Sequence, residues 1–155
     1  MNIINRHLSH GAEKNNPNLI VIHAMGEYIS DPNPMLAVDF LDKLGLSAHA
    51  LILPNCDVMI CRRPDQGAYH ARGFNTDSLG LEFLVEGDHD YESFIKSIKK
   101  PYLAKGQLEA GVELVRHWEK MYNINKVVRH SDLSPGRKVD PGRGFPWDKF
   151  INEVK

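Results

Sequence analysis

The chain alternates short apolar runs, rich in β-branched residues, with longer segments in which apolar residues recur at helical spacing. A short run bounded by turn residues predicts a buried strand. Single strands are expected at 19–23, 78–85 and 125–128, and a hairpin is expected from 47–53 and 57–62. Gly87 is expected to end the second strand, and the hairpin turns at Pro54, Asn55 and Cys56.

Four segments are predicted to be helical: 34–44, 91–99, 103–122 and a short helix after Pro146. In the longest, one face carries Leu108, Val112, Val115 and Trp118. Gly45 is expected to cap the end of the first helix. Because strands and helices interleave, we expect an α/β fold: a single domain over residues 1–155 with a central mixed β-sheet flanked by helices.

Length and charge narrow the class of protein. The chain has 155 residues, a usual size for one domain, and 42% apolar and 25% charged residues, as in ordinary soluble proteins. Its net charge is -1, and no segment is strongly basic. Binding to nucleic acid requires a basic face, so we expect no nucleic-acid partner.

The sequence carries no membrane signal. Residues 1–7 lack the apolar stretch of a secretory signal peptide, and no window approaches the ~20 apolar residues of a transmembrane helix. We therefore expect a cytoplasmic protein with no membrane partner, released by host lysis if it is phage-encoded. Cys56 and Cys61 are expected to be reduced, because their odd spacing places them on opposite faces of a strand.

His23 and His130 each follow an apolar strand, and Asp140 lies ten residues beyond His130. Two histidines and a carboxylate make a three-ligand zinc set that leaves a fourth position for water. The alternative is that the histidines are structural and that Asp140 caps a turn. With eight histidines in the chain, the residues alone leave both interpretations open.

Glu82 lies within an otherwise apolar strand, and Lys138 lies two residues before Asp140. Alternation along the strand could place Glu82 on a solvated face. If Glu82 faces a site instead, a buried carboxylate has a raised pKa and suits general acid/base catalysis. Lys138 is either a solvated lysine or a cation placed to stabilise an oxyanion.

Four sequence blocks together resemble the zinc N-acetylmuramoyl-L-alanine amidases, a family that includes amidase-type phage lysozymes, cytosolic cell-wall recycling amidases and peptidoglycan recognition proteins. The blocks are LIVIH (19–23), LSAH (46–49), His70-Ala71 with SLGLE (78–82), and HSDLSPGRKVDPG (130–142) with FPW (145–147). They cover roughly residues 18–151, and the last block is long and specific.

The resemblance implies a role for each matching residue. His23, His130 and Asp140 are similar to the zinc ligands of the family, in a cleft at one edge of the sheet. Glu82 matches the carboxylate that activates water, and Lys138 matches the residue that stabilises the oxyanion. His70 and Asn75 fall in the segment that lines the substrate groove of relatives. The chain departs from the family at residues 24–28, which form part of the groove wall, and at the turn containing Cys56, where relatives usually carry Asp-Gly.

The resemblance implies an enzyme that hydrolyses the amide bond between N-acetylmuramic acid, or its anhydro form, and L-alanine in peptidoglycan or soluble muropeptides. We expect the protein to be a monomer. One alternative is a recognition module that binds muropeptides without cutting them, although Glu82, Lys138 and Asp140 are all present. A second alternative is a zinc peptidase. A recycling enzyme is slightly favoured over an endolysin, because the C-terminal block is more similar to that branch of the family.

Overall fold

Seven strands form one mixed sheet in the computed structural model, which describes residues 2–155. The strands are β1 (Ile3–Asn5), β2 (Leu19–Ser30), β3 (Pro34–Leu36), β4 (Ala50–Ile52), β5 (Val58–Ile60), β6 (Ser78–His89) and β7 (Lys126–Arg129). The helices are α1 (Ala37–Lys43), α2 (Tyr91–Ser97), α3 (Gln107–Met121), α4 (His130–Leu133) and α5 (Trp147–Val154). Met1, which the predicted domain includes, lies outside the described residues.

The long strand β2 organises the sheet, whose order is β1-β5-β4-β6-β2-β3. It pairs with β6 in parallel along most of its length. On its other side it pairs first with β7 in parallel and then with β3 in antiparallel orientation. The hairpin β4–β5 is antiparallel, and β4 lies parallel to β6. The predicted α/β fold with a central mixed sheet is therefore confirmed.

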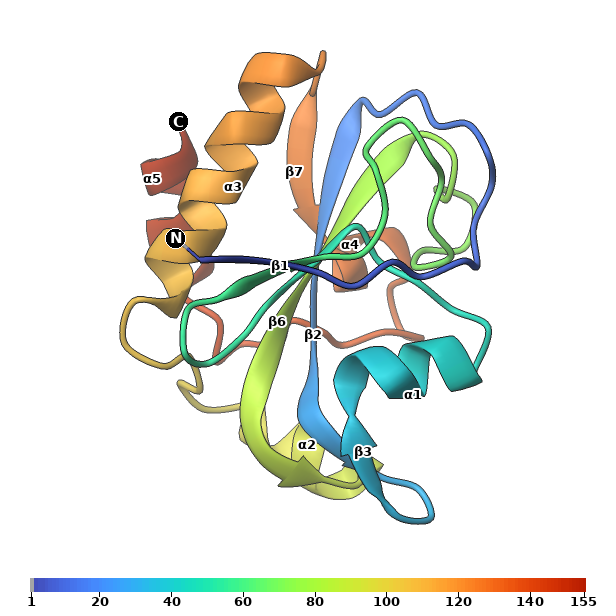
Figure 1. Cartoon of the computed structure of the whole chain (residues 1–155). Coiled ribbons are helices and arrows are strands. Elements are labelled where there is room, and N and C mark those ends of the chain that lie inside the picture. Colours follow the sequence, from blue (N-terminus) through green and yellow to red (C-terminus); the bar gives the residue numbers. More distant parts are fainter. Residues whose placement is uncertain (1) are drawn as a thin grey trace.

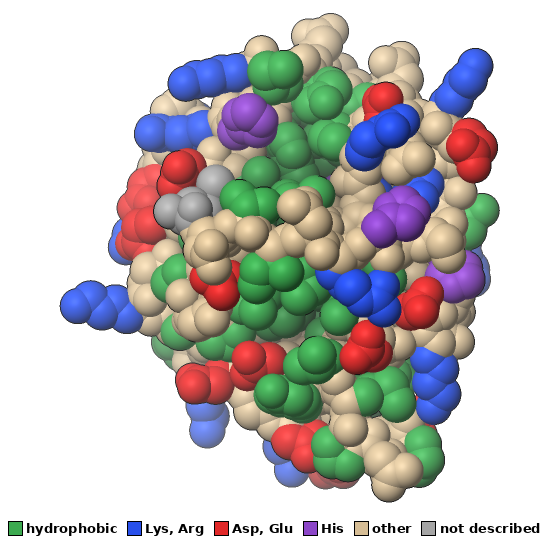
Figure 2. Space-filling model, in the orientation of Figure 1, with side chains coloured by type: hydrophobic (Ala, Val, Ile, Leu, Met, Phe, Trp, Pro, Cys, Tyr) green, Lys and Arg blue, Asp and Glu red, His purple; other side chains and the backbone are tan. Residues whose placement is uncertain are grey.

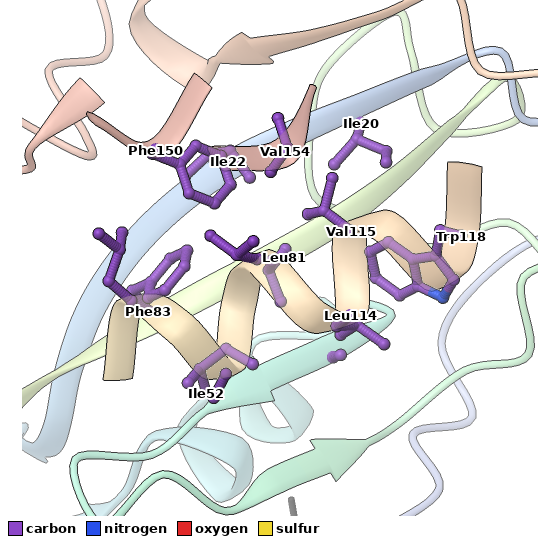
Figure 3. Close-up of a cluster of buried hydrophobic side chains, with 14 of the residues drawn as sticks. Ile20, Ile22, Ile52, Leu81, Phe83, Leu114, Val115, Trp118, Phe150 and Val154 are labelled. Carbon is purple, nitrogen blue, oxygen red and sulfur yellow. The ribbon is translucent and has the colours of Figure 1, made fainter. Parts of the chain in front are cut away.

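Helices cover both faces of the sheet. α3 and α5 lie together on one side, and α1 lies on the other (Figure 1). The larger core lies between the sheet and α3 with α5 (Figure 3), and its labelled side chains are Ile20, Ile22, Ile52, Leu81, Phe83, Leu114, Val115, Trp118, Phe150 and Val154. A second cluster joins α1 to the opposite face through residues such as Val38, Leu41 and Leu84.

Alternation along β6 separates the core from the polar side of the sheet. Leu79, Leu81 and Phe83 point into the larger core, so Ser78, Gly80 and Glu82 point to the opposite face. α3 approaches the core face closely, because a Cβ at Gly111 would lie 2.3 Å from the Phe83 ring. The face opposite α3 is therefore the one on which polar chemistry can gather.

Two strands run further than the sequence predicts. β2 continues past His23 to Ser30, because β6 and then β3 pair with its second half. The prediction that His23 ends its strand is wrong. Gly87 does not end β6 either: its φ of 98° is accommodated where the β2–β6 register shifts after Gly26, so that two β6 residues oppose one β2 residue.

Two of the four predicted helices, α1 and α3, begin later than expected. Residues 34–36 pair with the end of β2 as strand β3, so the first helix starts at Ala37. α3 starts at Gln107, after Gly106 at φ 85°. The buried Gln107 amide donates to the carbonyls of Ile52 and Leu84 at 3.0 and 2.8 Å, which ties the start of α3 to the sheet. Strand β1 and helix α4 were not predicted.

Two local expectations, the free thiols and the Gly45 cap, are confirmed. Cys56 and Cys61 are free thiols. Cys56 adopts φ 74° at the hairpin turn, and Gly45 adopts φ 72° just after α1. Within residues 2–155, every helix falls short of the length and hydropathy that a membrane span needs. On the face shown in Figure 2, acidic and basic side chains are interspersed.

Candidate metal centre

The sheet register brings two of the candidate residues side by side. His23 on β2 lies directly opposite Glu82 on β6. β7 pairs with β2 only as far as the Ile22–Arg129 pair. The chain then leaves the sheet, so that His130, the first residue of α4, lies beside His23 with ring centroids 4.3 Å apart. The site therefore forms at the sheet edge where β7 ends.

The loop after α4 returns Asp140 to the same place. The Ser131 N–H donates to the Asp140 carbonyl at 3.1 Å, and the Ala24 N–H of β2 donates to Asp140 Oδ2 at 3.4 Å. The Tyr102 hydroxyl donates to the Pro141 carbonyl at 2.8 Å and so holds the chain just beyond the carboxylate. Hydrogen bonds from three segments thus hold Asp140 and the residue that follows it in place.

Donor atoms of His23, His130 and Asp140 all lie within 4.8 Å of one another. His130 Nδ1 is 3.1 Å from Asp140 Oδ1, and His23 Nδ1 is 3.3 Å from Asp140 Oδ2. Ligands at ~2.0–2.2 Å from zinc in a tetrahedral arrangement are separated by roughly 3.3 Å. The spacing and the chemistry of this donor set therefore fit a zinc ion.

The electrostatics of the three donors also suit a cation. Burial would raise the pKa of Asp140, but the imidazoles of His130 and His23 beside the carboxylate outweigh this effect and hold the pKa well below its usual range. Burial lowers the pKa of His23, although the neighbouring Asp140 opposes this. Both shifts favour the ligand forms that metals bind, an ionised carboxylate and a neutral imidazole.

Glu82 faces the cluster and not solvent. The residue is only 7% exposed, and its Oε1 lies 3.5 Å from His23 Nδ1. Oε2 is buried without a hydrogen-bond partner among the described residues. Burial, followed by the charge of Asp140, raises the pKa of Glu82 well above its usual value, against the effect of Lys138. These properties match those of a general acid/base.

Lys138 lies half-buried on the wall of a cavity of about 740 Å³ that contains the cluster. Its main-chain N–H donates to the Ser134 carbonyl at 3.0 Å, which holds the loop that carries it. Its positive charge reaches both Glu82 and His23. The structure thus brings Lys138 together with the four other residues that the sequence singled out as ligands and acid/base.

His70 and Asn75 also line this cavity, and both make contacts within the protein. The Asn75 side-chain oxygen accepts hydrogen bonds from the N–H groups of His70 and Ala71 at 3.0 and 2.9 Å. His70 Nδ1 lies 2.9 Å from His23 Nε2, on the side of His23 away from the carboxylates. Sequence reasoning missed the hydroxyl of Ser78, which contacts His70 Nε2 at 3.0 Å; its only signal is a serine two positions from Gly80 in an apolar strand.

Two known proteins match parts of the sequence. The chain is 32% identical over 88 residues to the Escherichia coli N-acetylmuramoyl-L-alanine amidase AmiD, covering 54% of this chain and 30% of that protein. It is 45% identical over 31 residues to the Haemophilus influenzae 1,6-anhydro-N-acetylmuramyl-L-alanine amidase AmpD, covering 20% of this chain and 17% of that protein. The matched segments thus span less than a third of either relative.

The fold matches over its full extent. The crystal structure of a selenomethionine derivative of AmpD superposes with a TM-score of 0.76 at 23% identity, covering 99% of this chain and 94% of that chain. Residues 13–143 match the family model described as N-acetylmuramoyl-L-alanine amidase. This match includes the proposed ligands and both candidate catalytic residues, and it shows that the chain belongs to the N-acetylmuramoyl-L-alanine amidase family.

Proposed function

We propose that this protein is a zinc-dependent hydrolase of the amide bond between N-acetylmuramic acid, or its anhydro form, and L-alanine of the stem peptide. The observation that carries the proposal is the convergence of His23, His130 and Asp140 with a buried Glu82 in one open cleft. Family membership and the names of the relatives AmiD and AmpD support this substrate class.

His23, His130 and Asp140 would hold the zinc ion. When bound, zinc polarises a carbonyl and lowers the pKa of a water ligand toward 7. Glu82, 3.5 Å from His23, accepts the proton of the attacking water, whose oxygen forms the new bond to the lactyl carbonyl carbon. Glu82 then delivers that proton to the L-alanine nitrogen as the carbon–nitrogen bond breaks. The raised pKa of Glu82 suits a group that must accept and release one proton.

Lys138 is positioned for the charge that develops on the carbonyl oxygen. Its ammonium group lines the same cavity as Glu82, and a cation aimed at the oxyanion stabilises the transition state more than the substrate. His70 and Asn75 border the cleft, and we propose that their segment forms part of the groove wall. A cavity of about 740 Å³ is in the range of ordinary ligand sites.

A binding module that does not cut its ligand is the competing function. Such a module needs the groove but neither a complete donor set nor a buried proton carrier. Here three donors lie within 4.8 Å of one another, and Glu82 Oε2 is buried with no hydrogen-bond partner among the described residues. A buried carboxylate oxygen without a hydrogen-bond partner destabilises the fold, and catalysis gives a reason for it.

Hydrolysis is tested by incubating zinc-loaded protein with soluble anhydro-muropeptide and, in parallel, with intact sacculi. Release of whole stem peptides is expected, with activity removed by a chelator and restored by zinc. We propose a recycling-type enzyme, so turnover should be faster on the soluble substrate. Shortened peptides would identify a peptidase, and faster turnover on sacculi would favour an endolysin. Binding without any product would contradict the proposed activity.

A further inference from the structure

His23 makes polar contacts through both of its ring nitrogens. Nδ1 faces Asp140 Oδ2 at 3.3 Å and Glu82 Oε1 at 3.5 Å. Nε2, on the other side of the ring, lies 2.9 Å from His70 Nδ1. A neutral imidazole carries one proton, so the partner at Nε2 decides whether Nδ1 keeps the lone pair that a metal requires.

The partners of His70 fix where its own proton lies. The Ser78 hydroxyl donates to the Phe74 carbonyl, which can only accept. With its single proton committed there, Ser78 Oγ must accept from His70 Nε2, 3.0 Å away. The neutral His70 ring is therefore protonated at Nε2, and His70 Nδ1 presents a lone pair. His23 must then donate to it from Nε2, which leaves His23 Nδ1 unprotonated.

Strand β6 is shaped to hold the His70 ring in this place. Gly80 has a negative φ, so backbone conformation does not call for glycine there. A Cβ at Gly80 would lie 2.5 Å from His70 Nδ1 and 2.6 Å from its Cγ, so the ring rests directly on the strand. Ser78, two residues earlier on the same face, supplies the hydroxyl. One glycine and one serine thus give the ring its space and its acceptor.

The loop that carries His70 is also held. Asn75 accepts from the His70 and Ala71 main-chain N–H groups at 3.0 and 2.9 Å. Ser47 Oγ accepts from the N–H of Tyr69 at 2.9 Å and donates to the His10 carbonyl. These hydrogen bonds to the N–H groups of residues 69–71 thus fix the main chain that carries the His70 ring.

We propose that His70 is a positioning residue for the metal centre: supported by Ser78, it accepts a hydrogen bond from His23 Nε2–H and so keeps His23 Nδ1 available as a ligand. The inference rests on the proposed zinc function. It gives His70 a role that does not require contact with substrate. Loss of such an outer partner typically costs 10–100-fold in metal affinity.

The first test measures the zinc dissociation constant of metal-free protein by competition with a chromophoric chelator. His70→Ala should weaken zinc binding about 10–100-fold. His70→Asn, whose side-chain oxygen can occupy the place of Nδ1, should recover most of that loss. His117→Ala, which removes an exposed imidazole on α3, is the matched control and should bind zinc as the wild type does.

The second test reads the protons directly in the unsubstituted, zinc-loaded protein, from the ¹⁵N shifts of the imidazole nitrogens. His70 should be protonated at Nε2 and bare at Nδ1. A His70 ring protonated at Nδ1 would overturn the proposal whatever the variants do. This readout does not depend on whether His70→Ala folds.

The outcomes separate this inference from the proposed function. A His70→Ala protein that binds zinc as tightly as wild type, with only KM for muropeptide raised, would make His70 a substrate contact and refute its positioning role. Wild-type protein that binds zinc but hydrolyses no muropeptide would contradict the proposed activity and leave the His70 result standing. Wild-type protein with no zinc affinity would refute both.

Discussion

Acidification should destabilise the fold through the buried residue His49. His49 is 0% exposed; its Nδ1 accepts from the Gly80 N–H at 3.0 Å, and its Nε2 donates to the Gln66 carbonyl at 2.7 Å. The Gly80 bond requires the neutral ring, because a protonated Nδ1 cannot accept a hydrogen bond. Burial lowers the pKa of His49 from 6.5 to about 4, with a smaller contribution in the same direction from Arg62. The bond to Gln66 opposes the shift.

The sign follows from proton counting. Between the folded pKa of about 4 and the unfolded value of 6.5, the unfolded chain binds the proton and the folded protein does not. The free energy of unfolding therefore falls with falling pH across this window. The stabilisation is fully present above the unfolded pKa and is lost as the pH falls toward 4. At about 1.4 kcal/mol for each pKa unit, the full contribution is about 3 kcal/mol, of which about 2 kcal/mol is lost between pH 7 and pH 5.

Urea unfolding of metal-free wild type and His49→Asn, at about pH 7 and about pH 5, isolates this contribution. The asparagine oxygen can still accept from the Gly80 N–H but does not titrate. Buried groups whose pKa does not depend on His49, such as His23, titrate alike in both proteins, so their contributions cancel. On acidification, the free energy of unfolding should fall by about 2 kcal/mol more in the wild type than in the variant. Equal losses in the two proteins would refute the reasoning.

Three further predictions concern the site and the thiols. Glu82→Gln and Lys138→Ala should both retain zinc, and KM should change little in either variant. The kcat should fall about 10²–10⁴-fold in Glu82→Gln and about 10²–10³-fold in Lys138→Ala. A Glu82→Gln protein with more than about a tenth of wild-type kcat would remove Glu82 from the mechanism. The kcat/KM of the wild type should fall on the acid side, because burial raises the pKa of Glu82 and only its ionised form accepts a proton; a profile flat from about pH 4 to 7 would contradict this. In the native protein, a thiol reagent should modify Cys56 and spare Cys61, which is 1% exposed and whose pKa burial raises to about 12; mass spectrometry showing Cys61 modified first would disprove it.

Periodicity predicted the elements better than their ends. The α3 face with Leu108, Val115 and Trp118 is confirmed as buried, because a long amphipathic helix is stable only with its apolar face packed against the core. The ends depended on pairing that a local pattern cannot show. β2 extends because β3 and the second half of β6 pair with it, and α3 starts late because Gln107 bonds to two strands of the sheet.

For the candidate site too, the sequence indicated which residues take part, and the structure was needed to show how they are arranged. The resemblance to the family supplied His23, His130 and Asp140, and the structure brings their donor atoms together. The residues alone left open whether Glu82 faces solvent; the β2–β6 register, which sets it opposite His23, decides this. The bond between His70 and His23 joins residues 47 positions apart. No spacing rule could have found it.

The central claim is that water attacks the lactyl carbonyl at the His23–His130–Asp140 centre. It is tested most directly by digesting a muropeptide with zinc-loaded protein in ¹⁸O-labelled water and weighing the products by mass spectrometry. The account predicts an intact, unlabelled stem peptide with a free L-alanine amine, and one ¹⁸O atom in the new carboxylate of the muramic acid. A label in a peptide carboxylate, or no cleavage at all, would contradict it.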